Sequence, residues 1–156
     1  MSLSRIAFAS VAPLLLLVGS LGSQALAQVA QDPGNPVRVA CVGDSITEGT
    51  ANAEHGLNSW PLIMGRLLES ESPGGYEVGN FGRSGATLLK QGSKPYWGQD
   101  VYAKGLGFEP HVVVINLGTN DATHANWAAH GDEFEGDYRE LIEVYMALET
   151  KPRILL

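Results

Sequence analysis

The chain has 156 residues and a net charge of −7, from 10 basic and 17 acidic side chains. This charge disfavours binding to nucleic acid or to an anionic membrane surface, because both need clustered Lys and Arg. Cys41 is the single cysteine, so an internal disulfide and a cysteine metal cluster are excluded.

The first segment in chain order has the features of a signal peptide. Arg5 is followed by apolar residues 6–22 and by the small-x-small sequence at residues 25–27. A transmembrane anchor is the alternative, but this apolar stretch is short and contains Pro13, whereas a spanning helix needs roughly 20 apolar residues. We expect cleavage after residue 27, a secreted or periplasmic protein without stable membrane insertion, and a mature net charge of −8.

Beyond a polar, flexible leader at residues 28–36, strand and helix patterns alternate along the chain. We expect strands at 37–42, 76–81, 111–117 and 153–156, and helices at 58–70, 98–106 and 132–149. Such alternation predicts the α/β class, with a parallel sheet between helices on both faces. Residues 37–156 are therefore expected to form one domain, a three-layer α/β/α sandwich.

Two of the expected helices carry an apolar stripe at helical spacing. The stripes are Leu62, Ile63, Leu67 and Leu68 in the first helix, and Phe134, Tyr138, Leu141, Ile142 and Tyr145 in the last. A stripe of this kind faces the core of a globular protein. The aromatic residues of the last helix are therefore interpreted as core packing and not as a binding surface.

The first expected strand ends in the sequence GDSITEG at residues 43–49. Ser45 lies just after this strand and is expected to begin a short helix, where unpaired backbone N–H groups stabilise negative charge. A serine in this position suits a nucleophile whose own N–H faces an oxyanion. The alternative is that Ser45 only caps the helix, as serine often does.

Two further loops follow strands, and each is ambiguous alone. NFGRSGAT at 80–87 contains Gly82 and Gly85, which permit unusual backbone angles and close approach of a ligand. It lacks the ending of a phosphate-binding loop. LGTND at 117–121 offers an amide donor in Asn120 and a turn-forming carboxylate in Asp121, and such pairs are common in purely structural turns.

Taken in order, GDSxxxG, NxGxxGAT and GTND resemble the motifs of the SGNH hydrolases, also called GDSL-like esterases. The resemblance extends from about residue 37 to residue 156. TLLKQGSKPYW at 87–97 and NWAAHGDEFEGDY at 126–138 are similar to the exported bacterial branch called sialate O-acetylesterase-like. The implied fold is the flavodoxin-like SGNH fold.

The resemblance implies a serine esterase that works through an acyl-enzyme without a cofactor or metal. Ser45 is then the nucleophile, and the oxyanion hole consists of the Ser45 and Gly85 N–H groups and the Asn120 amide. Asp44 and Asp121 are supporting residues. The implied substrate is a small-molecule or glycan ester, an O-acetyl group on a carbohydrate by the branch resemblance.

Two tryptophans near the expected site, Trp97 and Trp127, are candidates for stacking on a sugar ring, with core packing as the alternative. The acidic charge of the chain disfavours acidic sugars such as sialic acid.

The family's C-terminal DxxH motif is not found at a matching position. Asp121 and His124 share the spacing, but they lie inside the third motif. The catalytic His and Asp are therefore not expected in this chain, which we interpret as an N-terminal fragment that is unstable or aggregates when expressed alone and whose activity alone is in doubt. His55, His124 and His130 are expected to be exposed in loops, with contact to substrate as the alternative and a role as the base as the weaker interpretation.

Other functions remain open from the sequence. A lipid or lysophospholipid esterase is the alternative enzyme, and a non-catalytic carbohydrate-binding domain is the alternative class. A flavodoxin-like nucleotide-binding protein is disfavoured by the missing phosphate loop. The acyl group, the acceptor and the oligomeric state are not determined by these residues.

Overall fold

A computed structural model of the protein describes residues 34–50 and 57–156. The expected signal peptide, most of the expected leader and His55 lie outside these described residues.

Four parallel strands form one sheet in the order β2-β1-β3-β4. They are β1 (Val37–Gly43), β2 (Tyr76–Gly82), β3 (Val112–Asn116) and β4 (Arg153–Leu155). All four strands were predicted, and each predicted end lies within one residue of the observed end. Val39 of β1 is paired with Val78 of β2 on one side and with Val112 of β3 on the other, so strand β1 is hydrogen-bonded along both edges.

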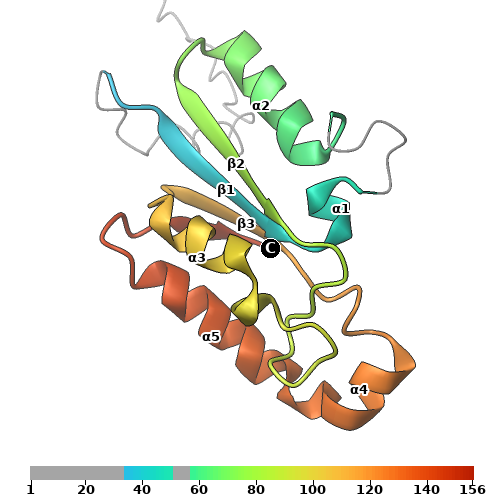
Figure 1. Ribbon diagram of the computed structural model, residues 1–156. Helices are drawn as coiled ribbons and strands as arrows, with labels where there is room; N and C mark the ends of the chain where they lie inside the picture. The colour runs from blue at the N-terminus through green and yellow to red at the C-terminus, as the bar shows by residue number, and fades with distance from the viewer. Residues whose placement is uncertain (1–33, 51–56) are drawn as a thin grey trace, which may run out of the picture. The chain divides into compact units, whose positions relative to one another are not determined.

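Helices lie on both sides of this sheet, as Figure 1 shows, and the predicted α/β class is confirmed. The α-helices are α1 (Ser45–Glu48), α2 (Trp60–Glu71), α3 (Asp100–Gly107), α4 (His124–His130) and α5 (Phe134–Met146). Short 3₁₀ turns precede α3 and α5 at Tyr96–Gly98 and Gly131–Glu133. No helix in the described part of the chain is long and apolar enough to span a bilayer.

The main core lies between the sheet and the pair α3 and α5, which share one face in Figure 1. Val113 of β3 and Leu141 and Tyr145 of α5 are fully buried there. Gly105 lets α3 approach α5, because a Cβ at this position would lie 2.7 Å from the Tyr145 hydroxyl. The interpretation of the α5 stripe as core packing is confirmed, with Phe134 and the others packed at the edge of this core.

Most of the apolar stripe predicted for α2 does not face the sheet. Leu62, Ile63 and Leu67 are 38%, 43% and 63% exposed, and only Leu68 of the stripe is half-buried. The side of the helix toward β2 instead carries Gly65, whose missing Cβ would lie 3.5 Å from the Val78 side chain. The helix is therefore rotated about its axis relative to the prediction. The side that packs on the edge strand β2 carries the small residue Gly65 and not most of the leucine stripe.

Candidate active site

The three motif loops meet at the point where the strand order of the sheet reverses. The chain passes from β1 outward to β2 and then crosses to β3 on the other side of β1. Ser45 follows β1, and the 117–121 loop follows β3. Loops that diverge at such a switch point leave a crevice beyond the carboxyl ends of the strands, where α/β proteins bind ligands. In Figure 1, α1 and the long loop after β2 lie at this end of the sheet.

Asp44 shapes the turn that presents Ser45. Asp44 is buried and is the N-cap of α1, where its Oδ1 accepts the N–H of Ile46 at 2.9 Å. Ser45 is therefore the first residue inside the helix, and the alternative in which Ser45 only caps it is wrong. The Ser45 side chain is half-buried, and its hydroxyl makes no hydrogen bond within the described ranges.

Close backbone packing fixes the loop after β2 to α1. A Cβ at Gly82 would lie only 2.1 Å from the backbone nitrogen of Glu48, so the two backbones are in direct contact. The Arg83 N–H donates to the Gly43 carbonyl at 2.9 Å, and the Ser84 N–H donates to Glu48 Oε2 at 2.5 Å. The position of this loop is thus set by the helix that Ser45 begins.

Gly85 turns this loop toward the site. Its φ of +76° lies in the left-handed region that favours glycine, and the Ala86 N–H closes the turn by donating to the Arg83 carbonyl at 3.0 Å. Among the described residues, neither the Gly85 N–H nor the Ser45 N–H has a hydrogen-bond acceptor. Unpaired backbone donors of this kind can bind an anion.

The Asn120 carboxamide joins the other two loops. Its Nδ2 donates to the Ala86 carbonyl at 2.9 Å and lies 3.4 Å from Asp44 Oδ2. Ala86 directly follows Gly85, and Asp44 directly precedes Ser45. The structure therefore places the Asn120 amide, one of the three predicted oxyanion donors, in contact with the chain neighbours of the other two, Ser45 and Gly85.

Asp121, the neighbour of Asn120, is fully buried and receives two backbone hydrogen bonds. Its Oδ1 accepts the Leu89 N–H at 2.7 Å, and its Oδ2 accepts the Leu88 N–H at 3.0 Å. The carboxylate thus fastens the loop after β3 to the segment that follows Gly85.

Asn126 belongs to the same region and was missed in the sequence analysis. Its amide hydrogen-bonds to the Asn120 carbonyl and to Ser93, from the first half of α4. Asparagine is common on protein surfaces, and a helix as short as α4 gives no periodic pattern. No feature of the single sequence therefore distinguished this residue.

The histidines lie away from the Ser45 hydroxyl or on the surface. His124 and His130 are the first and last residues of α4, so their predicted placement in a loop was wrong. His111 lies before β3, and its Nδ1 accepts the Arg38 N–H at 3.0 Å. Within residues 34–50 and 57–156, no group of three His, Cys, Asp or Glu side chains is arranged to hold a metal ion.

The two candidate tryptophans differ in environment. The Trp97 indole N–H donates to the Leu88 carbonyl at 2.7 Å, and its ring packs against Tyr102 at 5.6 Å between centroids. Trp127 is 51% exposed and rests on Phe134, with ring centroids 5.6 Å apart. Trp97 therefore has a packing role, whereas Trp127 keeps a surface open to a ligand.

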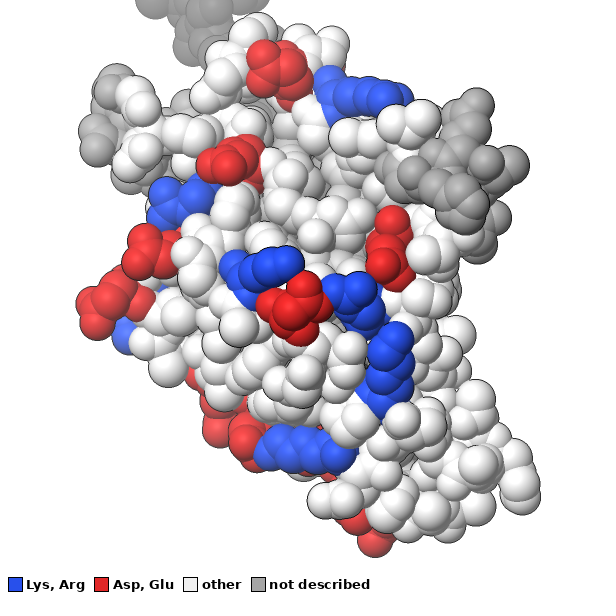
Figure 2. Space-filling model, in the orientation of Figure 1, with Lys and Arg blue, Asp and Glu red and all other residues white. Residues whose placement is uncertain are grey.

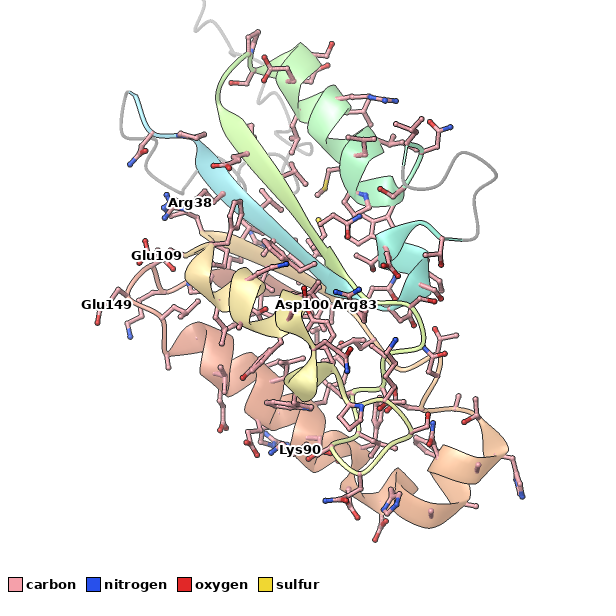
Figure 3. The ribbon with its side chains drawn as sticks, viewed as in Figure 1. Arg38, Arg83, Lys90, Asp100, Glu109 and Glu149 are labelled. Carbon is pink, nitrogen blue, oxygen red and sulfur yellow. The ribbon has the colours of Figure 1, made fainter. Side chains whose placement is uncertain are left out.

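Two cations near the site, Arg83 and Lys90, are paired with carboxylates, whereas Lys94 Nζ donates to the Ser84 carbonyl at 2.7 Å. Arg83 forms an ion pair with Asp100, and the two point toward one another in Figure 3. A hydrogen bond from Lys104, with the nearby Arg83 charge, holds the pKa of Asp100 below its ordinary value. Lys90 Nζ lies 2.5 Å from Glu140 Oε2. Figure 2 shows basic and acidic side chains interspersed on this face, which thus lacks a broad patch of one sign.

This combination of a parallel sheet, a serine at the first strand end and donors from two other loops defines a hydrolase-like site. The chain belongs to the GDSL-like lipase/acylhydrolase family, whose sequence profile matches residues 41–156.

Two known proteins illustrate the similarity. The chain is 37% identical over 127 residues to an acetylxylan esterase of Xylanibacter ruminicola, covering 74% of this chain and 25% of that protein. It resembles the solved structure of TesA with a TM-score of 0.51 and 22% identity, over 75% of this chain and 57% of TesA. The chain thus spans about a quarter of the length of this curated relative. The likeness to TesA supports the fold.

Proposed function

We propose that this chain carries the nucleophile and the oxyanion-binding residues of a serine esterase. The observation that carries the proposal is the Asn120 amide, which contacts residues directly beside both Ser45 and Gly85. In the proposed reaction the Ser45 oxygen attacks the ester carbonyl carbon, and the bond from that carbon to the alkoxide oxygen breaks. The alkoxide takes up the proton lost by the Ser45 hydroxyl and leaves as the alcohol, and an acyl group remains on Ser45. Water then attacks the acyl-enzyme and releases the acid.

Both steps place negative charge on the carbonyl oxygen of the ester. The Ser45 and Gly85 N–H groups and one N–H of Asn120 are the proposed donors to this oxygen. The Asn120 contact with Asp44 is long, at 3.4 Å, so a substrate oxygen can compete for that proton. Donors already fixed by the fold need no reorganisation during the reaction, and removing one typically costs about 10²–10³ in rate.

Ser45 also requires a general base, whose help is typically worth about 10²–10⁴-fold. Of the histidines in the described part of the chain, none hydrogen-bonds to Ser45. His111 is held by the Arg38 backbone at the amino end of β3, the opposite end of the strand from the 117–121 loop. The proposal therefore assigns no base among His111, His124 and His130.

The proposed substrate is an O-acetyl ester of a carbohydrate. The named activity of the acetylxylan esterase relative supports this class. The exposed Trp127 ring offers an apolar surface of the kind on which a sugar packs. The proposed placement in the sialate O-acetylesterase-like branch is supported by the sequence resemblance of residues 87–97 and 126–138.

We also propose that the protein is exported, on the basis of the charge, apolar stretch and cleavage sequence in residues 1–27. Amino-terminal sequencing of the protein recovered from outside the cytoplasm tests this. A mature chain that begins at residue 28 supports export, and a retained Met1 contradicts it.

The function is tested with the full-length protein and p-nitrophenyl acetate. Ser45→Ala is expected to lower kcat by at least about a thousandfold while the protein stays folded, because the nucleophile is lost. Ser84→Ala is the matched control, since Ser84 contacts Glu48 and Lys94 through its backbone. Unchanged hydrolysis by Ser45→Ala would remove the proposed nucleophile.

The substrate class is tested separately. Release of acetate from acetylated xylan, with little hydrolysis of long-chain p-nitrophenyl esters, is expected for a carbohydrate esterase. Preference for the long-chain esters would assign a lipid esterase instead. Glycan binding without hydrolysis of any ester would assign a binding domain.

A further inference from the structure

We propose that Asn126 is a positioning residue, which sets the orientation of Asn120 in the oxyanion site from outside that site. This inference rests on the proposed esterase function, because it assumes that the Asn120 amide donates to the reacting carbonyl oxygen. Asn126 itself is not proposed to contact the substrate.

The Asn126 amide hydrogen-bonds to two segments, the loop after β3 at Asn120 and the segment that contains Ser93. Its Nδ2 donates to the Asn120 carbonyl at 2.8 Å and to Ser93 Oγ at 3.2 Å. Its Oδ1 accepts the Ser93 N–H at 3.0 Å. The side chain is buried, with 7% of the residue exposed. A buried amide with all of these partners is rigidly held, since each lost bond would leave a polar group unpaired.

These hydrogen bonds allow Asn126 to hold the backbone of Asn120 in one orientation. Asn120 is held by its side chain at Ala86 and by its backbone carbonyl at Asn126. The next residue, Asp121, holds the loop again through the Leu88 and Leu89 N–H groups. Three side chains, Asn120, Asp121 and Asn126, thus fasten this part of the chain to the segment 86–93, and Asn126 also binds the carbonyl of the Asn120 peptide.

Loss of this contact would let the Asn120 peptide rotate while its neighbours stay in place. Thr123 also donates to the Asn120 carbonyl, from Oγ1 at 3.0 Å and from its N–H at 3.4 Å. The N–H contact is long, and Thr123 is exposed, so that water can replace its hydroxyl. A misplacement of about 1 Å in a reacting arrangement can lower the rate about 100-fold. The expected effect of disturbing Asn126 is therefore on the transition state and only weakly on substrate binding.

The test variant is Asn126→Asp in the full-length protein. The carboxylate keeps the size of the amide and can still accept the Ser93 N–H, but it cannot donate to the Asn120 carbonyl. With p-nitrophenyl acetate, kcat per active site is expected to fall about 10- to 100-fold, and KM to change less than about twofold. Active sites are counted by titration with a fluorophosphonate, so that unfolded protein does not lower kcat.

Two further variants complete the test. Ser93→Ala removes only the hydroxyl partner of Asn126, and kcat is expected to stay within about threefold of wild type. Asn126→Ser places a short hydroxyl in the same position without a buried charge. Its kcat is expected to fall in the same way as that of Asn126→Asp.

The outcomes separate this inference from the proposed function. If Ser45→Ala retains hydrolysis, the proposed function fails. If Ser45→Ala is inactive while both Asn126 variants keep the wild-type kcat, only the positioning role fails. The role is also overturned if both Asn126 variants lose all folded protein, since Asn126 would then be a purely structural residue.

Discussion

Replacing Asp121 tests how strongly the loop after β3 is fastened to the rest of the site. Asp121 is fully buried, and its two oxygens accept the N–H groups of Leu88 and Leu89 at 3.0 and 2.7 Å. A buried donor left without a partner costs about 1–3 kcal/mol. Asp121→Ala leaves two such donors, so the expected loss is about 2–6 kcal/mol, a large part of the roughly 5–15 kcal/mol by which domains are stable.

Asp121→Asn is the more informative variant. The asparagine retains one carbonyl oxygen but turns an NH₂ group toward the other donor, so one of the two bonds is lost. The free energy of unfolding is expected to fall by about 1–3 kcal/mol. The measurement is urea unfolding of the full-length protein, followed by tryptophan fluorescence. A lower midpoint urea concentration with an unchanged m-value reports the loss of stability.

Asp132→Asn is the matched control, since Asp132 is an exposed aspartate in the 3₁₀ turn before α5. Its effect is expected to stay within about 0.5 kcal/mol. If Asp121→Asn is no more destabilising than Asp132→Asn, the two backbone hydrogen bonds do not fasten this loop, and the account of the site is wrong.

Two other predictions concern packing and pH. Gly82→Ala is expected to lower kcat at least about tenfold, because its Cβ would meet Glu48 N at 2.1 Å and displace α1, whereas Gly136→Ala, with nothing within 4 Å, is expected to keep wild-type activity. Burial, followed by the Arg38 charge, lowers the pKa of His111, so the folded protein binds this proton less readily than the unfolded chain. The contribution of His111 to the free energy of unfolding is therefore expected to be complete above about pH 6.5 and to decline as the pH falls from there through the lowered pKa. His111→Gln is expected to weaken this dependence in urea unfolding across that range, and an unchanged pH profile would contradict it.

The sheet and the Ser45 turn were predictable from local sequence. Val37–Gly43 and Val112–Asn116 are apolar runs long enough to be recognised as strands buried in a parallel sheet. The sequence GDS after the first run placed Ser45 at the start of a helix. Only the structure showed that Asp44, and not Ser45, caps that helix.

The failures of prediction come from tertiary contacts. The α2 leucines have the correct spacing for a stripe, but the packing of Gly65 on Val78 decides which side of the helix meets β2. Periodicity reports a pattern within one segment and says nothing about the partner. The leucines of α2 therefore suggested that their side of the helix is buried, whereas the side that packs on β2 carries Gly65.

Positions that depend on contacts between distant segments were the hardest to predict. Trp97 and Trp127 are equivalent in sequence terms, but a hydrogen bond to Leu88 commits Trp97 to packing. Asn126 gains its role from Ser93, which is 33 residues away along the chain. Pairings of this kind are determined by the folded arrangement and leave no local signature.

The central claim, that Ser45 is the attacking residue, is tested most directly by covalent labelling. The full-length protein is treated with a fluorophosphonate, digested, and its peptides are analysed by mass spectrometry. One adduct per active site is expected on Ser45, with loss of p-nitrophenyl acetate hydrolysis in proportion to labelling and no adduct in Ser45→Ala. Complete inactivation with the adduct on another residue, while Ser45 remains unmodified, would contradict the account.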